Sequence, residues 1–270
     1  MTYVWHGERE VLNLLTAGRV SSLMALVAIF LLINLGIKLA RTRLPKIRPI
    51  AALEAVEEAV GRATEMGKSI FTTPGWADVS GDSAAATFAA LEIISHVAGL
   101  TARYGTKLVV AVSFPNVYPL AQQAVQEAYL AAGKAHMFDQ DMIRFTSPMQ
   151  YAYAAACLGM IQRENVAAAV LVGHFASEAV NFVEATVAAG AMAIAGTTNT
   201  SQLPYFAAAC DYTMIGEELL AAGAYLSNDP ARVGSIAGQD YAKLVILALL
   251  VVGVILRTMN IKIVSDLLKL

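Results

Sequence analysis

Short apolar runs alternate with longer alanine-rich runs between residues 45 and 238. Six runs have the length and β-branched composition of strands: 68–72, 107–114, 142–146, 167–173, 191–196 and 211–216. Helical runs cover 51–67, 83–105, 120–133, 149–165, 177–190 and 201–209. Such alternation is typical of parallel strands joined by helical crossovers, and continuously apolar strands indicate helices on both faces. The pattern predicts the α/β class, with a Rossmann-like, doubly wound, mostly parallel sheet of five or six strands.

A different pattern precedes this domain. Residues 20–37 contain no charged side chain, and about 20 apolar residues are needed to cross a bilayer as a helix. A cleaved signal peptide is the alternative, but its apolar region is only about 7–15 residues long and ends at a small-residue cleavage site, which is absent here. We therefore expect an uncleaved transmembrane helix over residues 20–39.

Charge on the two sides of this helix predicts its orientation. The side that follows it is strongly basic, with Lys38, Arg41, Arg43, Lys46 and Arg48. Positively charged flanks remain in the cytoplasm. Residues 1–19 are therefore expected outside the cytoplasm, and the domain over residues 45–238 inside it, at the inner cell membrane.

A second apolar run covers residues 244–256. As a helix it rises about 20 Å, which is less than the ~30 Å hydrocarbon core, although Lys243 and Arg257 can extend their charged ends to the interface. We expect a second transmembrane helix over 241–257, followed by an amphipathic tail over 258–270. The alternative is a terminal helix buried in the α/β domain.

Composition supports a protein that is part soluble and part membrane. The chain is 57% hydrophobic and only 15% charged, whereas soluble domains carry about 25% charged residues. A net charge of −2 gives no basic surface for nucleic acid. Cys157 and Cys210 lie in apolar surroundings without a CxxC partner, which favours buried thiols.

Polar side chains follow the ends of the predicted strands. In an open parallel sheet the carboxyl edge forms the ligand crevice, and helix N-termini there attract anions. The candidate ligand-binding residues at this edge are Thr73, Ser113, Asn116, Thr146, Ser147, His174, Ser177, Glu178, Thr197, Thr198, Asn199 and Ser201.

The loop TTNTSQ, residues 197–202, has two explanations. Thr200 or Ser201 can cap the following helix, and turn preferences account for other residues. The segment also resembles phosphosugar isomerase (SIS) domains over residues 191–218, where a strand ends in a threonine, a serine-containing loop follows, and a small-residue helix leads to an aspartate, here Asp211. This resemblance implies a phosphate-contacting role for Thr197 and Ser201 and no catalytic residue.

The sequence lacks the common motifs for binding nucleotides and zinc. No G-x-G-x-x-G, P-loop or zinc-ligand spacing is found, and no catalytic residue, metal or cofactor is assigned. His96 lies among apolar residues within a helical run and is expected to pack in the core. His174, three residues before Ser177, is the histidine that we place at a site.

The overall layout also resembles a family of bacterial and archaeal membrane-anchored proteins known only as a domain of unknown function. The resemblance is carried by the order of its parts and by the phrases AMAIAGTTNTSQLPYF and CDYTMIGEELLAAGAYLS, and it implies no activity.

Low charge and alanine-rich helices favour a non-catalytic, homo-oligomeric scaffold or assembly protein. Its expected partners are the lipid bilayer, further copies of itself and other membrane proteins, but no nucleic acid. Tyr151 and Tyr153 are expected contact residues, since aromatic side chains are enriched at interfaces. The alternative is a domain that binds or senses a phosphorylated metabolite, and an SIS-like enzyme is less favoured.

Overall fold

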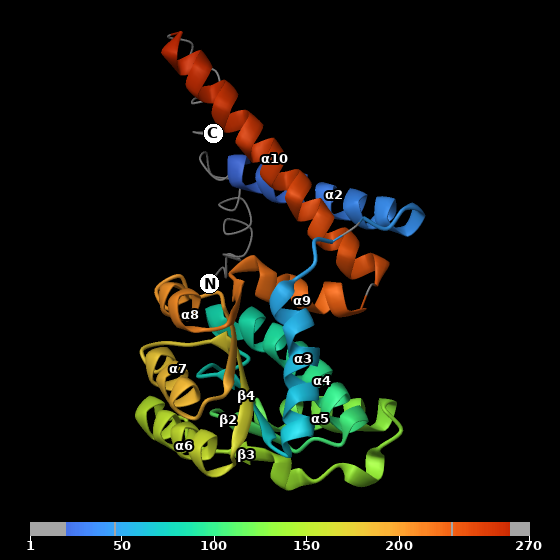
Figure 1. Cartoon of the computed structure of the whole chain (residues 1–270). Helices are drawn as coiled ribbons and strands as arrows, with labels where there is room; N and C mark the ends of the chain where they lie inside the picture. The colour runs from blue at the N-terminus through green and yellow to red at the C-terminus, as the bar shows by residue number, and fades with distance from the viewer. Residues whose placement is uncertain (1–19, 46, 228, 260–270) are drawn as a thin grey trace, which may run out of the picture. The chain divides into compact units, whose positions relative to one another are not determined.

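The computed structural model describes residues 20–45, 47–227 and 229–259 of the 270-residue chain. The chain divides into two compact units (Figure 1). We call Arg48–Ser227 the head, and helices α2 (Val20–Thr42) and α10 (Pro230–Thr258) the helix pair. The predicted N-terminal segment 1–19 and nearly all of the predicted tail 258–270 lie outside the described residues.

The head contains a six-stranded parallel sheet. Its strands are β1 (Ser69–Gly75), β2 (Leu108–Val112), β3 (Ile143–Phe145), β4 (Val166–His174), β5 (Met192–Thr197) and β6 (Tyr212–Ile215). They lie in the order β3-β2-β1-β4-β5-β6, and every neighbouring pair is parallel. The chain thus adds two strands on one side of β1 and then returns to place β4 on the other. This is the Rossmann order, with its topological switch point between β1 and β4.

Helices cover both faces of the sheet, as the apolar strands predicted. Their bounds are α3 (Ala51–Met66), α4 (Ala84–Tyr104), α5 (Tyr118–Ala131), α6 (Gln150–Arg163), α7 (Ala179–Ala188), α8 (Leu203–Ala209) and α9 (Glu217–Ser227). Short 3-10 turns lie at Gly81–Ser83, Ala135–Met137 and Gln140–Met142.

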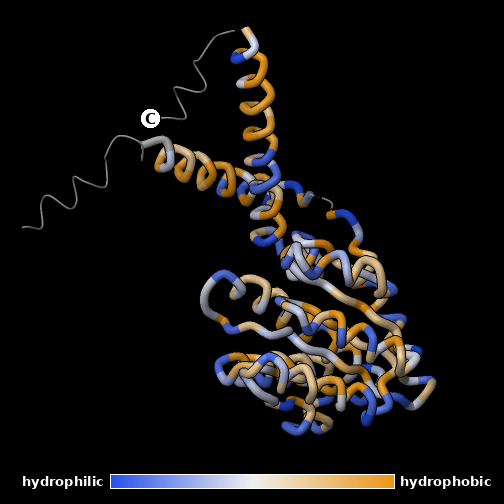
Figure 2. Tube along the Cα trace, turned by 90° about the vertical axis from the view of Figure 1, so that its left-hand side faces the viewer, coloured by the Kyte–Doolittle hydropathy of each residue, from blue (hydrophilic) through white to orange (hydrophobic). Residues whose placement is uncertain are grey.

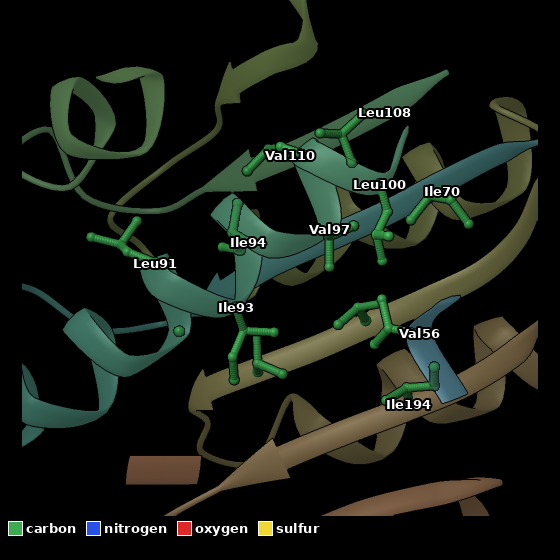
Figure 3. Close-up of a cluster of buried hydrophobic side chains, with 14 of the residues drawn as sticks. Val56, Ile70, Leu91, Ile93, Ile94, Val97, Leu100, Leu108, Val110 and Ile194 are labelled. Carbon is green, nitrogen blue, oxygen red and sulfur yellow. The ribbon is translucent and has the colours of Figure 1, made fainter. Parts of the chain in front are cut away.

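Successive strand residues enter two separate cores, because side chains alternate between the faces of a sheet. On β1, Ile70 packs with α3, α4, α5 and α9, whereas Phe71 packs with α6, α7 and α8. Figure 3 shows the first core, where Ile94 and Val97 of α4 lie close to Leu108 and Val110 of β2.

The predicted fold class is confirmed, and the differences are local. The second strand ends at Val112, because Phe114 begins the turn that leads to α5. Helix α6 begins at Gln150, one residue after the start of the predicted run. Ser147 Oγ accepts a hydrogen bond from the Met149 amide, 3.1 Å away, which forms a separate turn before the helix.

The outer surface of α6, α7 and α8 carries few charges. Arg163 and Glu184 are the only charged residues within these three helices. Tyr151 of α6, Val187 of α7 and Tyr205 of α8 are exposed, Tyr151 to 81%. We call this surface the α6–α7–α8 face (Figure 1).

Within the helix pair, α2 and α10 touch through glycines. A Cβ added to Gly36 would overlap backbone atoms of Gly234 and Gly238, and a Cβ added to Gly238 would overlap Ile33 and Leu32. Small residues four apart allow two helix backbones to approach this closely, as in membrane helix pairs. The contact therefore depends on a hydrogen atom in place of a side chain.

Both helices of the pair are long and apolar enough to span a membrane. Only 11% of the most apolar window of α2 and 6% of that of α10 is buried, so the chain itself leaves these side chains uncovered. Figure 2 shows hydrophobic colouring along α2 and along the C-terminal part of α10. The second transmembrane helix stays a prediction, which the uncovered apolar surface of α10 favours over the alternative of a buried terminal helix. Helix α4 has a similar composition, but 61% of its window is buried, since it forms part of the head core.

Candidate functional site

The predicted site residues do lie at or just beyond the carboxyl ends of the strands, but most of them bind to the protein itself. Thr73 is fully buried, its Oγ1 donates to the Ala111 carbonyl at 2.8 Å, and it lies 2.6 Å from the Tyr153 hydroxyl. Ser113 Oγ donates to the Gly75 carbonyl at 2.9 Å. Thr146 Oγ1 donates to the Val112 carbonyl at 3.0 Å. These hydroxyls join neighbouring strand ends.

A second group lies after β1 and β2. Asn116 donates from its side-chain amide to both carboxylate oxygens of Asp78, at 3.2 and 3.3 Å. Asp78 also accepts from the Ser80 hydroxyl and from the Val79 amide. Asp78 was not predicted as a site residue, although an acidic residue six positions after the predicted strand 68–72 was a usable signal. This group places a partly exposed carboxylate in the loop where a phosphate-binding sequence would be expected to place glycine amides.

The third group joins α6 to the end of β4. Gln150 Nε2 donates to Ser177 Oγ at 3.1 Å and to Glu178 Oε2 at 2.5 Å. The other oxygen of Glu178 accepts from the Ala176 amide, and the residue is only 2% exposed. Gln150 was not predicted, because its contact with Glu178 depends on the packing of α6 beside α7.

The polar loop after β5 forms its own turn. Thr197 Oγ1 accepts from the Asn199 amide at 3.1 Å, and Asn199 Oδ1 accepts from the amide and the hydroxyl of Ser201. Asn199 also donates to the Phe175 carbonyl at 2.8 Å. Neither Thr200 nor Ser201 caps α8, whose preceding residue is Gln202. Thr198 is half-buried, and no hydrogen bond of its side chain is found within the described part of the chain.

Glycines bring β1 and β4 unusually close at the switch point. Gly75 pairs with His174, and a Cβ at Gly75 would overlap the His174 carbonyl. Gly173 has a positive φ, and a Cβ there would overlap the Pro74 carbonyl. The Trp76 amide still donates to the His174 carbonyl at 2.9 Å, so the two strands stay joined beyond Gly75.

Aromatic side chains pack beside the point where β1 and β4 approach each other. The Trp76 ring lies 6.0 Å from that of Phe114, and its Nε1 donates to the Pro148 carbonyl at 2.8 Å. The His174 imidazole is half-buried, and in the described residues its side chain makes no hydrogen bond or ion pair. Among the predicted site residues it is therefore the titratable group left available at the switch point.

Buried titratable groups near the edge are held neutral. Burial, followed by the nearby Cys157 and Glu178, raises the pKa of Tyr153 well above its usual value. Burial likewise raises the pKa of the Cys157 thiol. The predicted contact role of Tyr153 is wrong, because its side chain is fully buried against Thr73 and Phe182.

The carboxyl edge of the sheet thus carries four separate hydrogen-bonded groups and the His174 imidazole. Among the residues that the structure describes, no three His, Cys, Asp or Glu side chains are grouped so as to hold a metal ion. Partly exposed amide and carboxylate groups at Asn116 and Asp78 suit a ligand with hydroxyls or a positive charge. They oppose a phosphate there, since like charges repel.

Comparison with known proteins gives a family but no activity. Residues 11–268 match a family model described as a domain of unknown function. No curated protein and no solved structure matches the chain.

Proposed function

The chain belongs to the DUF6754 family, and we propose that it is a membrane-anchored, non-catalytic, homo-oligomeric scaffold with an α/β head. The observation that carries this proposal is the weakly charged α6–α7–α8 face of the head, in a chain that also has two apolar helices.

The helix pair supports the anchoring part of the proposal. Large side chains are exposed all along the C-terminal half of α10, among them Leu244, Leu247, Leu250 and Val254. A helix that is apolar on all sides is stable only in a core or in lipid. Lys38, Arg41 and Arg43 follow the apolar part of α2, and this basic flank supports the proposal that the head lies in the cytoplasm, at the inner membrane.

The α6–α7–α8 face supports the oligomeric part. Exposed apolar patches of more than a few hundred Å² usually mark contacts, and soluble surfaces carry about 25–35% charged residues. The aromatic rings of Tyr151 and Tyr205 are exposed to 81% and 51%. A closed assembly of heads would cover these rings, with other membrane proteins as further partners.

Light scattering on the full-length chain in mild detergent tests this assembly. We expect a defined oligomer, which Ala155→Arg disrupts by placing an unpaired charge in the interface. Ala155 is an exposed residue of α6, so the head should still fold. The matched control is Gln126→Arg, also at an exposed position but on α5, which covers the opposite face of the sheet; it should leave the mass unchanged. A monodisperse monomer of the unmodified chain would contradict the proposal.

The second candidate function is binding of a small molecule at the carboxyl edge. It is favoured by the half-buried His174 at the switch point and includes the SIS-like proposal for Thr197 and Ser201. Phosphorylated metabolites should then raise the melting temperature, and Thr197→Ala should abolish the shift. The absence of any shift across a panel of sugar phosphates would refute the phosphate version.

A further inference from the structure

A cavity of about 490 Å³ lies within the helix pair, where α2 ends and α10 passes it. It is lined by Gly36, Leu39, Thr42, Arg43, Leu44, Pro45 and Tyr241. Gly36, Leu39 and Arg43 are spaced at i, i+3 and i+7, so they share one face of α2. Tyr241 follows Gly238 by one turn of α10, which places it directly beyond the glycine contact.

The residues that line the cavity include two hydrogen-bond donors that have no acceptor in the described part of the chain, and a group of apolar side chains. In the described residues the Arg43 guanidinium and the Tyr241 hydroxyl make no side-chain hydrogen bond or ion pair with the protein. The Thr42 hydroxyl donates to the Leu39 carbonyl at 2.7 Å, and its oxygen can still accept. Leu39, Leu44 and Pro45 supply apolar surface in the same cavity.

The position of the cavity along the helices identifies its environment. It follows the apolar stretch 20–37 of α2 and precedes the apolar stretch 244–256 of α10. The apolar stretch of α2 therefore ends near the cavity, and the apolar stretch of α10 begins near it. If they enter the bilayer, as proposed above, the cavity lies at the membrane–water interface, where tyrosine and arginine side chains are common.

We propose that this cavity binds the headgroup of an anionic phospholipid. The phosphate accepts charge-assisted hydrogen bonds from Arg43 and a further hydrogen bond from Tyr241. The glycerol and the first acyl carbons pack on Leu39, Leu44 and Pro45. The cavity should therefore bind a phospholipid in preference to inorganic phosphate. A free phosphate ion would leave the apolar side chains of the cavity exposed to water. Basic cavities between membrane helices on the cytoplasmic side recognise anionic lipids in this manner.

Native mass spectrometry of the detergent-purified full-length chain tests the site. Phosphatidylglycerol, phosphatidylcholine and inorganic phosphate are added in separate titrations. We expect preferential binding of phosphatidylglycerol. Arg43→Gln should weaken this binding roughly tenfold, as the loss of a charge-assisted hydrogen bond implies. Tyr241→Phe should weaken it less, by roughly threefold, because one neutral hydrogen bond is lost.

Arg41→Gln is the matched control, since it removes the same charge from the same helix but does not line the cavity. Its affinity should stay within about twofold of the unmodified chain. An equal loss in Arg41→Gln and Arg43→Gln would contradict the proposal, because it would indicate attraction to the basic segment as a whole. Equal binding of the two lipids, or displacement of the lipid by inorganic phosphate, would also contradict it.

This inference rests on the proposed anchor, and alkaline carbonate extraction separates the two. If the unmodified chain is extracted from membranes, the anchor itself fails and the lipid site with it. If it stays in the membrane while Arg43→Gln binds phosphatidylglycerol normally, only the lipid site is refuted.

Discussion

Gly75 shows how a single missing side chain fixes the geometry of the switch point. Its φ of 84° lies in the left-handed region, and a Cβ there would overlap the His174 carbonyl. Two separate penalties therefore oppose any other residue: the backbone conformation and the close approach of β1 to β4.

We expect Gly75→Ala to lower the free energy of unfolding by about 3 kcal/mol or more, because strain and steric overlap combine. Gly81→Ala is the control. Gly81 also has a positive φ, of 72°, but no atom lies within 4 Å of its added Cβ. Its cost should be about 1 kcal/mol, from the backbone conformation alone. Thermal unfolding of the full-length chain, followed by near-UV circular dichroism, measures both. Equal effects would show that the strands do not approach as described.

Glu164 links two strands through paired charges. Its carboxylate accepts from Lys107 Nζ at 2.7 Å and from Arg144 Nη1 at 2.6 Å. The hydrogen bond from Lys107, and then that from Arg144, hold the pKa of Glu164 below its usual value. A carboxyl group with a lowered folded pKa stabilises the protein above its unfolded pKa, and this contribution is lost as the pH falls through the folded pKa.

Glu164→Gln should therefore destabilise the head by about 1 kcal/mol at neutral pH. The difference from the unmodified chain should shrink once the pH falls below about 4.3, the usual pKa of glutamate. Denaturation midpoints measured across this pH range test the prediction, with the exposed Glu127→Gln as control. A difference that does not vary with pH would contradict the assigned ion pairs.

Residue roles were the hardest part to predict from the sequence. Strand ends identified Thr73 and Thr197 as edge residues, yet their partners, the Ala111 carbonyl and the Asn199 amide, depend on register and on the turn. The sequence suggested Thr200 or Ser201 as the cap, but Asn199 organises the loop, because its amide side chain both accepts and donates. A pattern of polarity cannot separate a hydroxyl that binds a ligand from one that binds its own backbone.

At the scale of elements, the contact between α2 and α10 is the feature that the helix pair depends on. Gly36 faces Gly234 and Gly238, so any larger side chain must push the backbones apart.

Gly238→Ile should separate the two helices. Spin labels at the exposed Leu31 and Leu244, with both native cysteines replaced by alanine, report the distance between them by double electron–electron resonance. We expect a narrow distribution in the reference chain and a broadened or shifted one in Gly238→Ile. The control Ala248→Leu, at an exposed α10 position, should leave it unchanged. Identical distributions in all three would exclude the glycine contact.

Elements themselves were largely predictable. Apolar runs bounded by glycine and proline gave all six strands, because period and length are local properties of a sequence. Helix ends were less accurate. Helix α10 begins at Pro230, with Asp229 Oδ1 accepting from the Ala231 amide, well before the apolar run that first indicated a helix. Hydropathy identifies the apolar part of a helix and not its polar start.

At the scale of the whole molecule, the protein combines a Rossmann-ordered head with two apolar helices, one before and one after the head in the sequence. The central proposal is that these helices anchor the protein and hold the head in the cytoplasm. The charge difference across α2 supplies the direction.

The two native cysteines are expected to contribute little to maleimide labelling, so an introduced cysteine can test this proposal. Cys157 is buried, and burial, with the nearby Asp211 charge, raises the pKa of the partly buried Cys210 to about 12. Because the thiolate is the reactive form, both should react slowly at neutral pH. A cysteine introduced at the exposed Ser80 of the head is then the principal site of labelling.

The most direct measurement is labelling of Ser80→Cys with a membrane-impermeant maleimide, in intact cells and after lysis. Thr2→Cys, in the segment predicted to lie outside the cytoplasm, is the reverse control. The account predicts that Ser80→Cys reacts only after lysis, whereas Thr2→Cys reacts in intact cells. Labelling of Ser80→Cys in intact cells to the level reached after lysis would contradict it.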